Sequence, residues 1–373
     1  MADVLAEVFC DVFRVRDAAG AKLKHGLKSR GFDRFDDREP APRVSVLVVN
    51  YNTCDLLRDC LMSLHKVVEP RFEVVVVDNA STDGSPAMVR DLFPGVRLIE
   101  LDRNLGFAGG NMRGYDNARG EYVCFLNSDT RVDSQFLSQM TGFMDVNPMV
   151  GGCQPKIQWM RDPTRLDSVG DWLTWTGLLH HRGYLAPDDL GEEPMDIFAA
   201  KGACMMFRAS LLEKIGVFDE NYWSYFEETD LCWRTWLSGH RVCLVPTAVV
   251  QHLLAGTSRD ATSYIVSYHA FKNRIHSMIK NFGGWTLVRV LPVHLVICAG
   301  LTLLYSLRGQ HDKARAIVGA LSWNVRSIRG TWQQRSYIQN QIRVMPERDL
   351  MRIAMHRVGL RYFWKLYREY ERV

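Results

Sequence analysis

Short runs of apolar, mostly β-branched residues alternate with helix-like stretches over residues 44–126. The runs read VSVLVV, EVVVV, VRLIEL and EYVCFL, and they lie at residues 44–49, 73–77, 96–101 and 121–126. Continuous apolar runs of this length are typical of strands that are buried on both faces. Between them, apolar residues recur at helical spacing in 56–64, and we expect further helices over 84–93 and near 108–118. This rhythm predicts an α/β fold with a mainly parallel sheet.

Polar side chains follow each predicted strand at the point where the strand ends. They are Asn50 and Asn52, Asp78 and Asn79, Asn104, and then Asn127 and Asp129. The carboxyl ends of parallel strands meet at one edge of a sheet, and ligands of open α/β sheets bind outside that edge. Four successive strands therefore direct polar groups to a single predicted site.

The flanks differ from this regular part. Residues 1–43 form a charged extension, and 44–260 form the predicted domain, whose part after residue 150 is mixed, rich in aromatic residues and suited to a second substrate site. Residues 261–373 hold 18 Lys and Arg but only 5 Asp and Glu, whereas residues 1–260 hold 28 and 37. This contrast favours a C-terminal region that meets an anionic membrane surface, although a solvated set of helical faces has the same composition. Nucleic acid is a less fitting partner, because the chemistry of the predicted site favours the membrane.

Residues 264–284 are predicted to form a basic amphipathic helix, which is followed by the apolar stretch WTLVRVLPVHLVICAGLTLLYS at 285–306. Arg289, Pro292 and His294 interrupt this stretch. Its longest uninterrupted part is short for a membrane-spanning helix, which needs about 20 apolar residues. Three alternatives remain open here, namely an interfacial or re-entrant membrane segment, a buried helix and a true span.

Cysteine usage indicates a reducing compartment. The nine cysteines are scattered, and no pair has the C-x-x-C spacing of zinc or redox sites. The first 20 residues have no basic start, long apolar run or cleavage site, so we expect no secretory leader. Together these features predict a cytoplasmic protein that is peripheral at the inner face of the cell membrane.

Three further groups carry candidate chemistry. Asn127-Ser128-Asp129 presents two oxygen ligands on the same side of a strand end, which suits Mg²⁺ or Mn²⁺ bound to a diphosphate, although N-S-D is also a common turn. Glu227, Glu228 and Asp230 lie among aromatic residues, where clustered carboxylates indicate proton transfer or cation binding, or else an exposed helix start. His252 follows a strand-like run and is either a metal ligand or a structural histidine. The glycine-rich segment 104–111 allows close approach to a ligand but is neither G-x-G-x-x-G nor a P-loop.

Six motifs in order resemble the family 2 glycosyltransferases, and more narrowly the bacterial rhamnosyltransferase-type branch. They read VSVLVVNYN, VVVVDNASTDGS, NLGFAGGNMRG, YVCFLNSDT, KGACMMFRASLLEKIGVFDENY and YFEETDLCWR, and they span about 44–260. The resemblance implies a GT-A fold, which combines a Rossmann-like nucleotide-binding half with a mixed acceptor half. With the basic C-terminus, the expected architecture is this fold followed by a helical, membrane-associating region.

The resemblance also implies roles for matching positions. Nucleotide-sugar binding is implied for Asn50, Asn52, Asp78, Asp83, Asn104, Gly106, Gly109, Gly110, Asn111 and Asn127. Asp129 and His252 would bind the divalent cation, and Asn127 stands where the family usually has the first Asp of D-x-D. Glu228 would be the catalytic base with Glu227 as the alternative. Asp230 is a further catalytic candidate and Arg234 a further candidate for nucleotide-sugar binding, and both would complete the motif as organisers of the site.

The implied activity is an inverting hexosyl transfer from a nucleoside-diphosphate sugar, with dTDP-rhamnose as the favoured donor. The acceptor would be a saccharide, free or linked to polyprenyl diphosphate, in the synthesis of cell-surface polysaccharide. A UDP-sugar donor and a nucleotidyltransferase on a similar sheet are the alternatives, followed by a non-catalytic glycan- or membrane-binding protein. The sequence leaves the oligomeric state open.

Overall fold

The computed structural model describes residues 41–253, 263–359 and 361–364. Its centre is a ten-stranded sheet with the order β10-β12-β6-β11-β4-β1-β2-β3, in which β5 also pairs with β12 and β7 with β6. The four strands predicted from the apolar runs are parallel neighbours. Their bounds are β1 Val44–Asn50, β2 Phe72–Asp78, β3 Arg97–Glu100 and β4 Tyr122–Asn127. The predicted 1–43 extension lies outside the described residues except for its last three positions.

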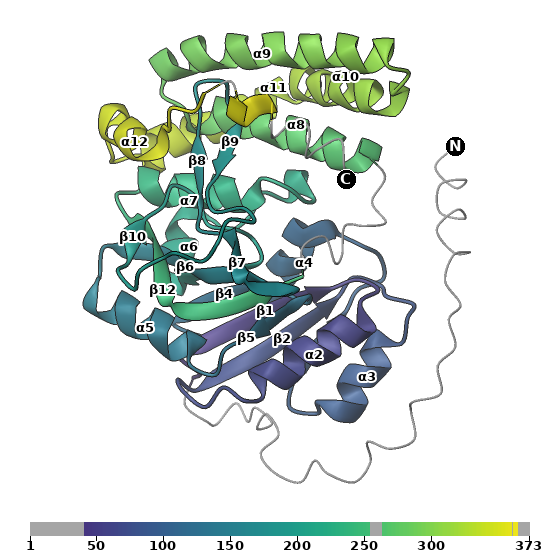
Figure 1. Cartoon of the computed structure of the whole chain (residues 1–373), viewed down its shortest axis with the longest axis vertical. Helices are drawn as coiled ribbons and strands as arrows, with labels where there is room; N and C mark the ends of the chain where they lie inside the picture. Colours follow the sequence, from purple (N-terminus) through teal and green to yellow (C-terminus); the bar gives the residue numbers. More distant parts are fainter. Residues whose placement is uncertain (1–40, 254–262, 360, 365–373) are drawn as a thin grey trace.

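Both faces of β1, β2 and β4 are buried, which explains their continuous apolar sequences, whereas β3 at the edge of the sheet is only partly buried, contrary to the prediction. Val44, Val46 and Val48 of β1 belong to one core cluster, whereas Leu47 belongs to the other. The helices over this half are α2 Cys54–Leu64, α3 Ser85–Leu92 and α4 Gly106–Tyr115, whereas α5 Phe136–Val146 packs on the other half of the sheet. In Figure 1, α2 and α3 lie over one face of the sheet and α4 lies on the other side. The three predicted helices are thus confirmed within a few residues of their expected bounds.

The second half of the sheet is mixed in direction. β11 (Cys204–Arg208) runs antiparallel to both β4 and β6 (Val150–Trp159), and β12 (Arg241–His252) is parallel to β6. The remaining strands are β5 Thr130–Val132, β7 Asp162–Ser168, β10 Met195–Asp196 and the separate hairpin β8 Asp171–Leu173 with β9 Leu179–His181. Its helical elements are α6 Ala209–Ile215, η1 Glu220–Tyr222 and α7 Glu227–Leu237. A parallel nucleotide-binding half with a mixed second half confirms the predicted fold class.

The C-terminal region is helical, as predicted. Its elements are α8 Ser263–Asn281, α9 Gly284–Leu307, α10 His311–Arg326, α11 Ile328–Tyr337, η2 Ile338–Ile342 and α12 Glu347–Ala354. Figure 1 shows α9 and α10 on the outside of the molecule, with α8 between them and α7. α8 carries an unusual number of buried polar side chains, including Lys272, Asn273 and Lys280, and thus joins this region to the domain below it. The division of the chain at residue 260 stays a prediction.

The apolar stretch 285–306 forms the larger part of α9, a continuous helix that contains Pro292. Among the described residues, α9 is the one helix that is long and apolar enough to cross a membrane, and only 17% of its most apolar window is buried. Its exposed large side chains include Trp285, Val288, Val296 and Leu303. The buried-helix alternative is therefore wrong for most of this segment, while an interfacial helix and a span both remain compatible with its composition.

Candidate functional site

A cavity of about 440 Å³ opens at the carboxyl ends of β1 and β4, where the sequence predicted a site. Eight of the residues singled out from the sequence line it, namely Asn79, Asn104, Gly106, Asn127, Asp129, Glu227, Glu228 and His252. They come from five separate segments of the chain and converge because β4 and β12 end at the same edge of the sheet. The metal and catalytic candidates thus share one cavity.

The candidates for nucleotide binding at the ends of β1 and β2 bind one another. The Asn50 Nδ2 donates to Asp78 Oδ1 at 2.9 Å and to Ser81 Oγ at 3.1 Å. The backbone N–H of Ser81 donates to Asp78 Oδ2 at 2.7 Å. Both oxygens of Asp78 therefore hold the loop after β2, and Asn50 and Asp78 are buried beneath the cavity wall.

Asn52 and Asp83 fix the two adjoining loops in the same way. The Thr82 N–H donates to Asn52 Oδ1 at 2.8 Å, and the Cys54 N–H at the start of α2 donates to Asp83 Oδ2 at 2.7 Å. Neither side chain lines the cavity; Tyr51 and Asn79, which follow the same strands, do so. Asn79, which the sequence placed at this edge, thus lines the cavity, whereas nucleotide binding by Asn52 and Asp83 stays a prediction.

The glycine-rich segment serves mainly to bring α4 close to its neighbours. Gly106 has a φ of +72°, and a Cβ added there would overlap the carbonyl oxygen of Trp223. A Cβ at Gly110 would come within 2.8 Å of Val49, and one at Gly109 within 2.7 Å of Leu105. Gly109, Gly110 and Asn111 are buried inside the packed helix and do not line the cavity, and their role in shaping the nucleotide-sugar site stays a prediction.

The candidate metal ligands face each other across the cavity floor. His252 Nε2 lies 3.3 Å from Asp129 Oδ1, which accepts no well-aligned hydrogen bond from the described residues. The other ring nitrogen of His252, Nδ1, lies 2.7 Å from Asp167 Oδ2. A carboxylate behind the imidazole fixes the ring orientation and is the usual second contact of a metal-binding histidine.

This donor set fits a divalent cation that also binds substrate. Asp129 supplies a carboxylate oxygen and His252 an imidazole nitrogen, both of which suit Mn²⁺ or Mg²⁺-type sites. No group of three or more His, Cys, Asp or Glu side chains within the described residues forms a complete site. The remaining ligands would therefore be phosphate oxygens and water.

Asp167 and Lys201 are site residues that sequence reasoning missed. Burial alone would lower the pKa of His252, but Asp129 and Asp167 raise it to about 9. Burial likewise works against the Asp167 carboxylate, yet Lys201 and His252 lower its pKa to about 2. Lys201 Nζ donates to Asp167 Oδ1 at 2.6 Å, and Lys201 lines the cavity. Asp167 has no local signal in the sequence, since it lies 85 residues from His252.

The two catalytic candidates stand at the first turn of α7. Burial raises the pKa of Glu228 to about 7, and the charge of Asp171 acts in the same direction. Burial and the adjacent Glu228 hold the pKa of Glu227 well above its ordinary range. A carboxyl group that titrates near neutral pH inside a cavity is well suited to accept a proton from a hydroxyl group.

The backbone that leads into α7 is strained and is held by α8. Trp223, Tyr225 and Phe226 have φ values of 62°, 72° and 75°, which are unfavourable for bulky residues. The Asn273 Nδ2 lies within hydrogen-bond distance of the carbonyl oxygens of Tyr222, Ser224 and Tyr225, at 3.0, 2.8 and 2.5 Å. Lys272 of the same helix donates to the Asn221 carbonyl. α8 thus positions the acidic pair.

Asp230 and Arg234 lie below the cavity and do not line it. Asp230 accepts hydrogen bonds from Tyr222 and Asn281 and lies 3.2 Å from Lys280 Nζ. Arg234 donates to Asp230 and to three backbone carbonyl groups after α6. Both residues join α7 to its neighbours, and the roles of Asp230 in catalysis and Arg234 in nucleotide-sugar binding stay predictions.

Comparisons with known proteins agree with this geometry. The family model described as glycosyl transferase family 2 matches residues 45–216. The chain is 25% identical over 280 residues to the N-acetylglucosaminyl-diphospho-decaprenol L-rhamnosyltransferase of Mycobacterium tuberculosis, which covers 64% of this chain and 85% of the relative.

Two solved structures share the fold. One is the mannosyltransferase PcManGT from Pyrobaculum calidifontis in complex with GDP-Man and Mn²⁺, with a TM-score of 0.50, 21% identity, and coverage of 80% of this chain and 91% of that chain. The other is residues 1–349 of S. aureus TarS in complex with UDP-GlcNAc, with a TM-score of 0.52, 19% identity, and coverage of 80% and 92%.

The fold and the site define a glycosyltransferase of the GT-A class, which confirms the predicted fold. More narrowly, residues 45–216 match glycosyltransferase family 2, and the matches support a hexosyltransferase of that family.

Proposed function

We propose that this chain transfers a sugar, with inversion, from a nucleoside-diphosphate donor to a saccharide carried on polyprenyl diphosphate during polysaccharide synthesis. The observation that carries the proposal is the single cavity shared by Glu228, Asp129 and His252. dTDP-rhamnose is the favoured donor, supported by the name of the mycobacterial relative. The UDP-GlcNAc complex of TarS keeps a UDP-sugar as the second candidate.

The nucleotide end of the donor would lie against the loops after β1 and β2. Tyr51 and Asn79 line the cavity there, and the network of Asn50, Asn52, Asp78 and Asp83 keeps both loops in place. Asn104 and Gly106 at the start of α4 would bound the sugar and diphosphate. These residues give a rigid wall whose backbone groups are available to the ligand.

Asp129 and His252 would hold a Mn²⁺ or Mg²⁺ ion together with the diphosphate oxygens, beside Asn127. When bound there, the ion neutralises the negative charge of the leaving diphosphate. Asp167 orients the His252 ring for this contact, and Lys201 keeps Asp167 ionised. The PcManGT complex, which contains Mn²⁺ and GDP-Man, supports this use of the site.

Glu228 would act as the general base. Its carboxylate takes the proton of the acceptor hydroxyl while that oxygen attacks the anomeric carbon from the face opposite the departing diphosphate. One displacement through an oxocarbenium-like transition state inverts the anomeric configuration. Glu227 is buried, and its Oε2 has no hydrogen-bond partner among the described residues. Glu227 would remain protonated, so that the two neighbouring carboxyl groups are not both negatively charged.

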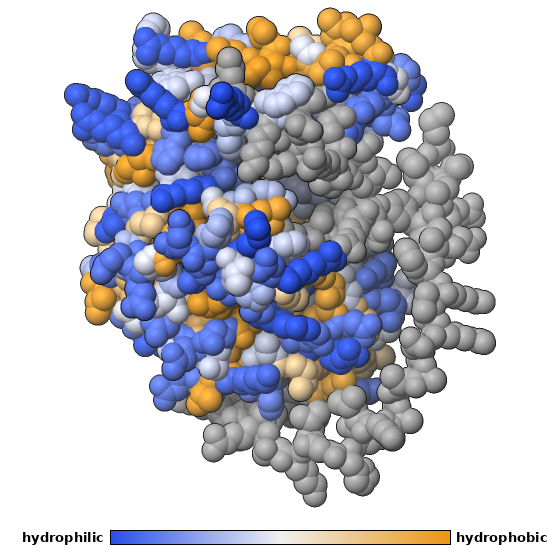
Figure 2. All heavy atoms as spheres, viewed as in Figure 1, coloured by the Kyte–Doolittle hydropathy of each residue, from blue (hydrophilic) through white to orange (hydrophobic). Residues whose placement is uncertain are grey.

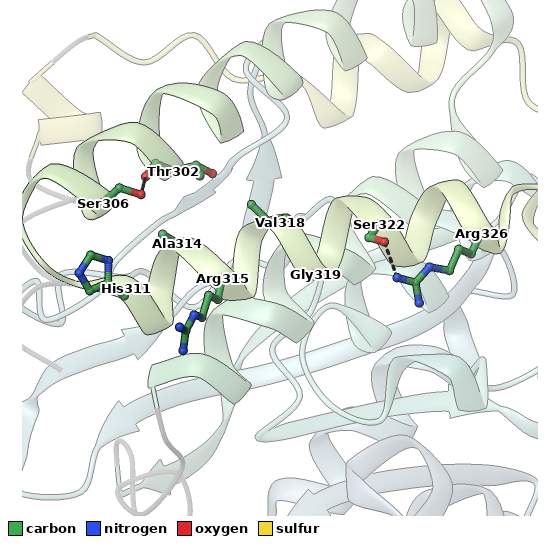
Figure 3. Close-up of a pocket in the computed structure, with 9 residues that line it drawn as sticks. All are labelled: Thr302, Ser306, His311, Ala314, Arg315, Val318, Gly319, Ser322 and Arg326. Carbon is green, nitrogen blue, oxygen red and sulfur yellow. Dashed lines mark hydrogen bonds between the residues drawn. The ribbon is translucent and has the colours of Figure 1, made fainter. Parts of the chain in front are cut away.

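The outer face of the C-terminal helices would contact an anionic membrane surface from the cytoplasmic side. Figure 2 shows apolar residues gathered along the edge of the molecule where α9 lies. Beside them, a groove of about 480 Å³ between the end of α9 and α10 carries His311, Arg315 and Arg326 (Figure 3). Apolar and basic groups in adjacent rows suit insertion among acidic lipid headgroups.

The decisive experiment offers dTDP-rhamnose, UDP-GlcNAc and GDP-mannose to the full chain with Mn²⁺ or Mg²⁺ and a polyprenyl-diphosphate saccharide. Thermal shift reports donor binding, and NMR of the product reports a new glycosidic bond and its anomeric configuration. A product without such a bond would instead favour a nucleotidyltransferase. Donor binding without transfer to any saccharide would favour a non-catalytic binding protein.

A further inference from the structure

A second cavity, of about 360 Å³, lies between the β8–β9 hairpin, α8 and α9. We call it the α8–α9 cavity. Its walls are largely apolar and include Leu179, Phe271, Ile297 and Leu301. Its size falls within the range of about 300–1,000 Å³ that small-ligand pockets occupy. It is separate from the cavity that contains Asp129 and Glu228, with which it shares no lining residue.

Arg274 of α8 is a buried cation on the wall of this cavity. Only 6% of the residue is exposed. Its guanidinium lies over the rings of Phe226 and Phe271, at 5.5 and 5.6 Å from their centroids. Within the described residues no carboxylate pairs with it, and its Nε is buried without a hydrogen-bond partner. An unpaired buried charge is costly, so the site calls for an anionic ligand.

The α8–α9 cavity adjoins the catalytic pair. Phe226, which contacts the Arg274 guanidinium, immediately precedes Glu227. On the opposite wall, His181 pairs with Asp171 at 2.8 Å, and the charges of both residues act on Glu228. A ligand whose anionic group lay at Arg274 would therefore have its adjoining part near the base.

The cavity also adjoins the apolar outer surface. Ile297, Leu301 and Tyr305 line it from one side of α9. Other positions of the same helix face outward, with Val296 72% and Leu303 61% exposed. Apolar side chains of α9 thus line the cavity on one side of the helix and face outward on the other.

We propose that the α8–α9 cavity binds the acceptor lipid, with the diphosphate at Arg274 and the first isoprenoid units against Phe271, Ile297 and Leu301. Lys313, which also lines the cavity, adds a second positive charge. This inference rests on the proposed function, and it assigns the lipid part of the acceptor to a site of its own. The saccharide then extends from the diphosphate to Glu228.

The test measures binding of farnesyl diphosphate to the full chain by calorimetry, with a chelator present to prevent binding through a divalent cation. Arg274→Met should weaken binding of farnesyl diphosphate at least tenfold, because the diphosphate loses the positive charge that binds it. Ala270→Phe, which fills the cavity without changing its charge, should weaken it by a similar factor. The matched control is Arg289→Met, at an exposed position of α9 outside the cavity. The affinity of this variant for farnesyl diphosphate should stay within twofold of the parent's affinity.

Each contrary result overturns a defined part of the proposal. Unchanged affinity in Arg274→Met and Ala270→Phe rules out this cavity. Equal binding of inorganic diphosphate and farnesyl diphosphate indicates a phosphate site with no lipid recognition. Equal losses of farnesyl diphosphate affinity in Arg274→Met and Arg289→Met, or an equal loss of farnesyl diphosphate binding and of phosphatidylglycerol vesicle binding in Arg274→Met, indicate a general surface charge effect and reject the site.

The binding assay needs no catalysis, so the two proposals can fail separately. If farnesyl diphosphate binds in an Arg274-dependent manner but no sugar is transferred, the proposed function fails and the cavity assignment stands. If the parent transfers sugar and Arg274→Met leaves the KM for the polyprenyl-diphosphate saccharide unchanged, the cavity assignment fails alone.

Discussion

At the scale of single residues, Glu228 and Glu227 show how position decides the role of the same side chain. Both stand in the first turn of α7 and both line the cavity. Glu227 is 4% exposed, whereas Glu228 is partly open to the cavity. Because two adjacent carboxylates resist simultaneous ionisation, the more accessible Glu228 is the one expected to exchange protons with substrate.

Glu228→Gln should lower turnover by about 10²–10⁴-fold, the usual contribution of a general base, because the amide cannot accept the proton. Donor binding, measured by thermal shift, should persist, since Glu228 contacts the acceptor side. Glu227→Gln serves as the matched control and should retain most of the turnover. The reverse ranking of the two variants would transfer the role of base to Glu227.

The raised pKa of Glu228 makes both the activity and the stability of the protein depend on pH. The base must be ionised, so kcat/KM should increase as the pH rises through about 7, where this group titrates. A carboxyl pKa above its ordinary value of 4.5 means that the folded state binds the proton more tightly. Stability is therefore lost as the pH rises from about 4.5 to 7, and Glu228→Gln should raise Tm at pH 8 but not at pH 4.5. Equal Tm differences at both pH values would contradict this.

Asp129→Ala should abolish the part of donor affinity that depends on Mn²⁺, because the cation loses a carboxylate ligand. Asp167→Asn should have a smaller effect, about 10–100-fold, which is typical of residues that orient a metal ligand. Isothermal calorimetry with and without chelator measures both effects. Chelator should lower the donor affinity of the parent to that of Asp129→Ala and leave the donor affinity of Asp129→Ala unchanged. If the donor affinity of Asp129→Ala still increased with Mn²⁺, the cation would bind elsewhere.

At the scale of elements, sequence predicted the strands of the parallel half well, because continuous apolar runs have few alternatives to a strand that is buried on both faces. The sequence also predicted which edge of the sheet holds the cavity, because the ends of these strands could be located from the same apolar runs. It could not predict that Asp167 of β7 would support His252, since that pairing depends on strand order in the mixed half. It could not separate the possible roles of Gly109 and Gly110, because a glycine needed for helix packing and one needed for ligand approach look alike in sequence.

The contact between α4 and the loop before α7 gives a prediction with an internal control. Gly84 and Gly106 both have positive φ, at +87° and +72°, but a Cβ at Gly84 would meet nothing within 4 Å. Gly84→Ala should therefore cost only the backbone penalty of about 1–2 kcal/mol in the free energy of unfolding. Gly106→Ala should cost more and should also lower kcat, because the Trp223 carbonyl must move and shift the acidic pair. Denaturant unfolding and steady-state kinetics measure the two effects, and equal behaviour of both variants would refute the coupling.

At the scale of the whole molecule, the basic C-terminal region and the acidic remainder place opposite charges on the two sides of the site. The sequence predicted that contrast, but it could not show that α8 would clamp the loop beside Glu227 while α9 faces outward. The same region thus supports the catalytic loop on one side and carries an apolar surface on the other. The outward-facing residues of α9 that we propose to contact the membrane can therefore be altered without disturbing the clamp.

Replacing Val288, Val296 and Leu303 of α9 by serine should reduce sedimentation with phosphatidylglycerol vesicles by about tenfold or more, because each buried apolar side chain contributes up to about 1.5–3 kcal/mol. The three are 65%, 72% and 61% exposed, so folding should be unaffected. The matched control replaces Val68, Val146 and Met149, which are 72%, 77% and 56% exposed on the opposite half of the molecule. Loss of vesicle binding in the control, or its retention in the α9 variant, would reject α9 as the contact surface.

The packing of α9 against α10 distinguishes an interfacial helix from a membrane-spanning helix. The 24 residues of α9 extend about 36 Å, enough to cross a bilayer. Yet α9 packs along α10, which carries Arg315 and Arg326 on its side of the shared groove, and a spanning α9 would draw these charges into the hydrocarbon core (Figure 3). We therefore expect α9 to lie in the plane of the membrane surface and alkaline carbonate to release the protein from membranes. Retention in the membrane pellet under those conditions would instead require α9 to separate from α10 and span the bilayer.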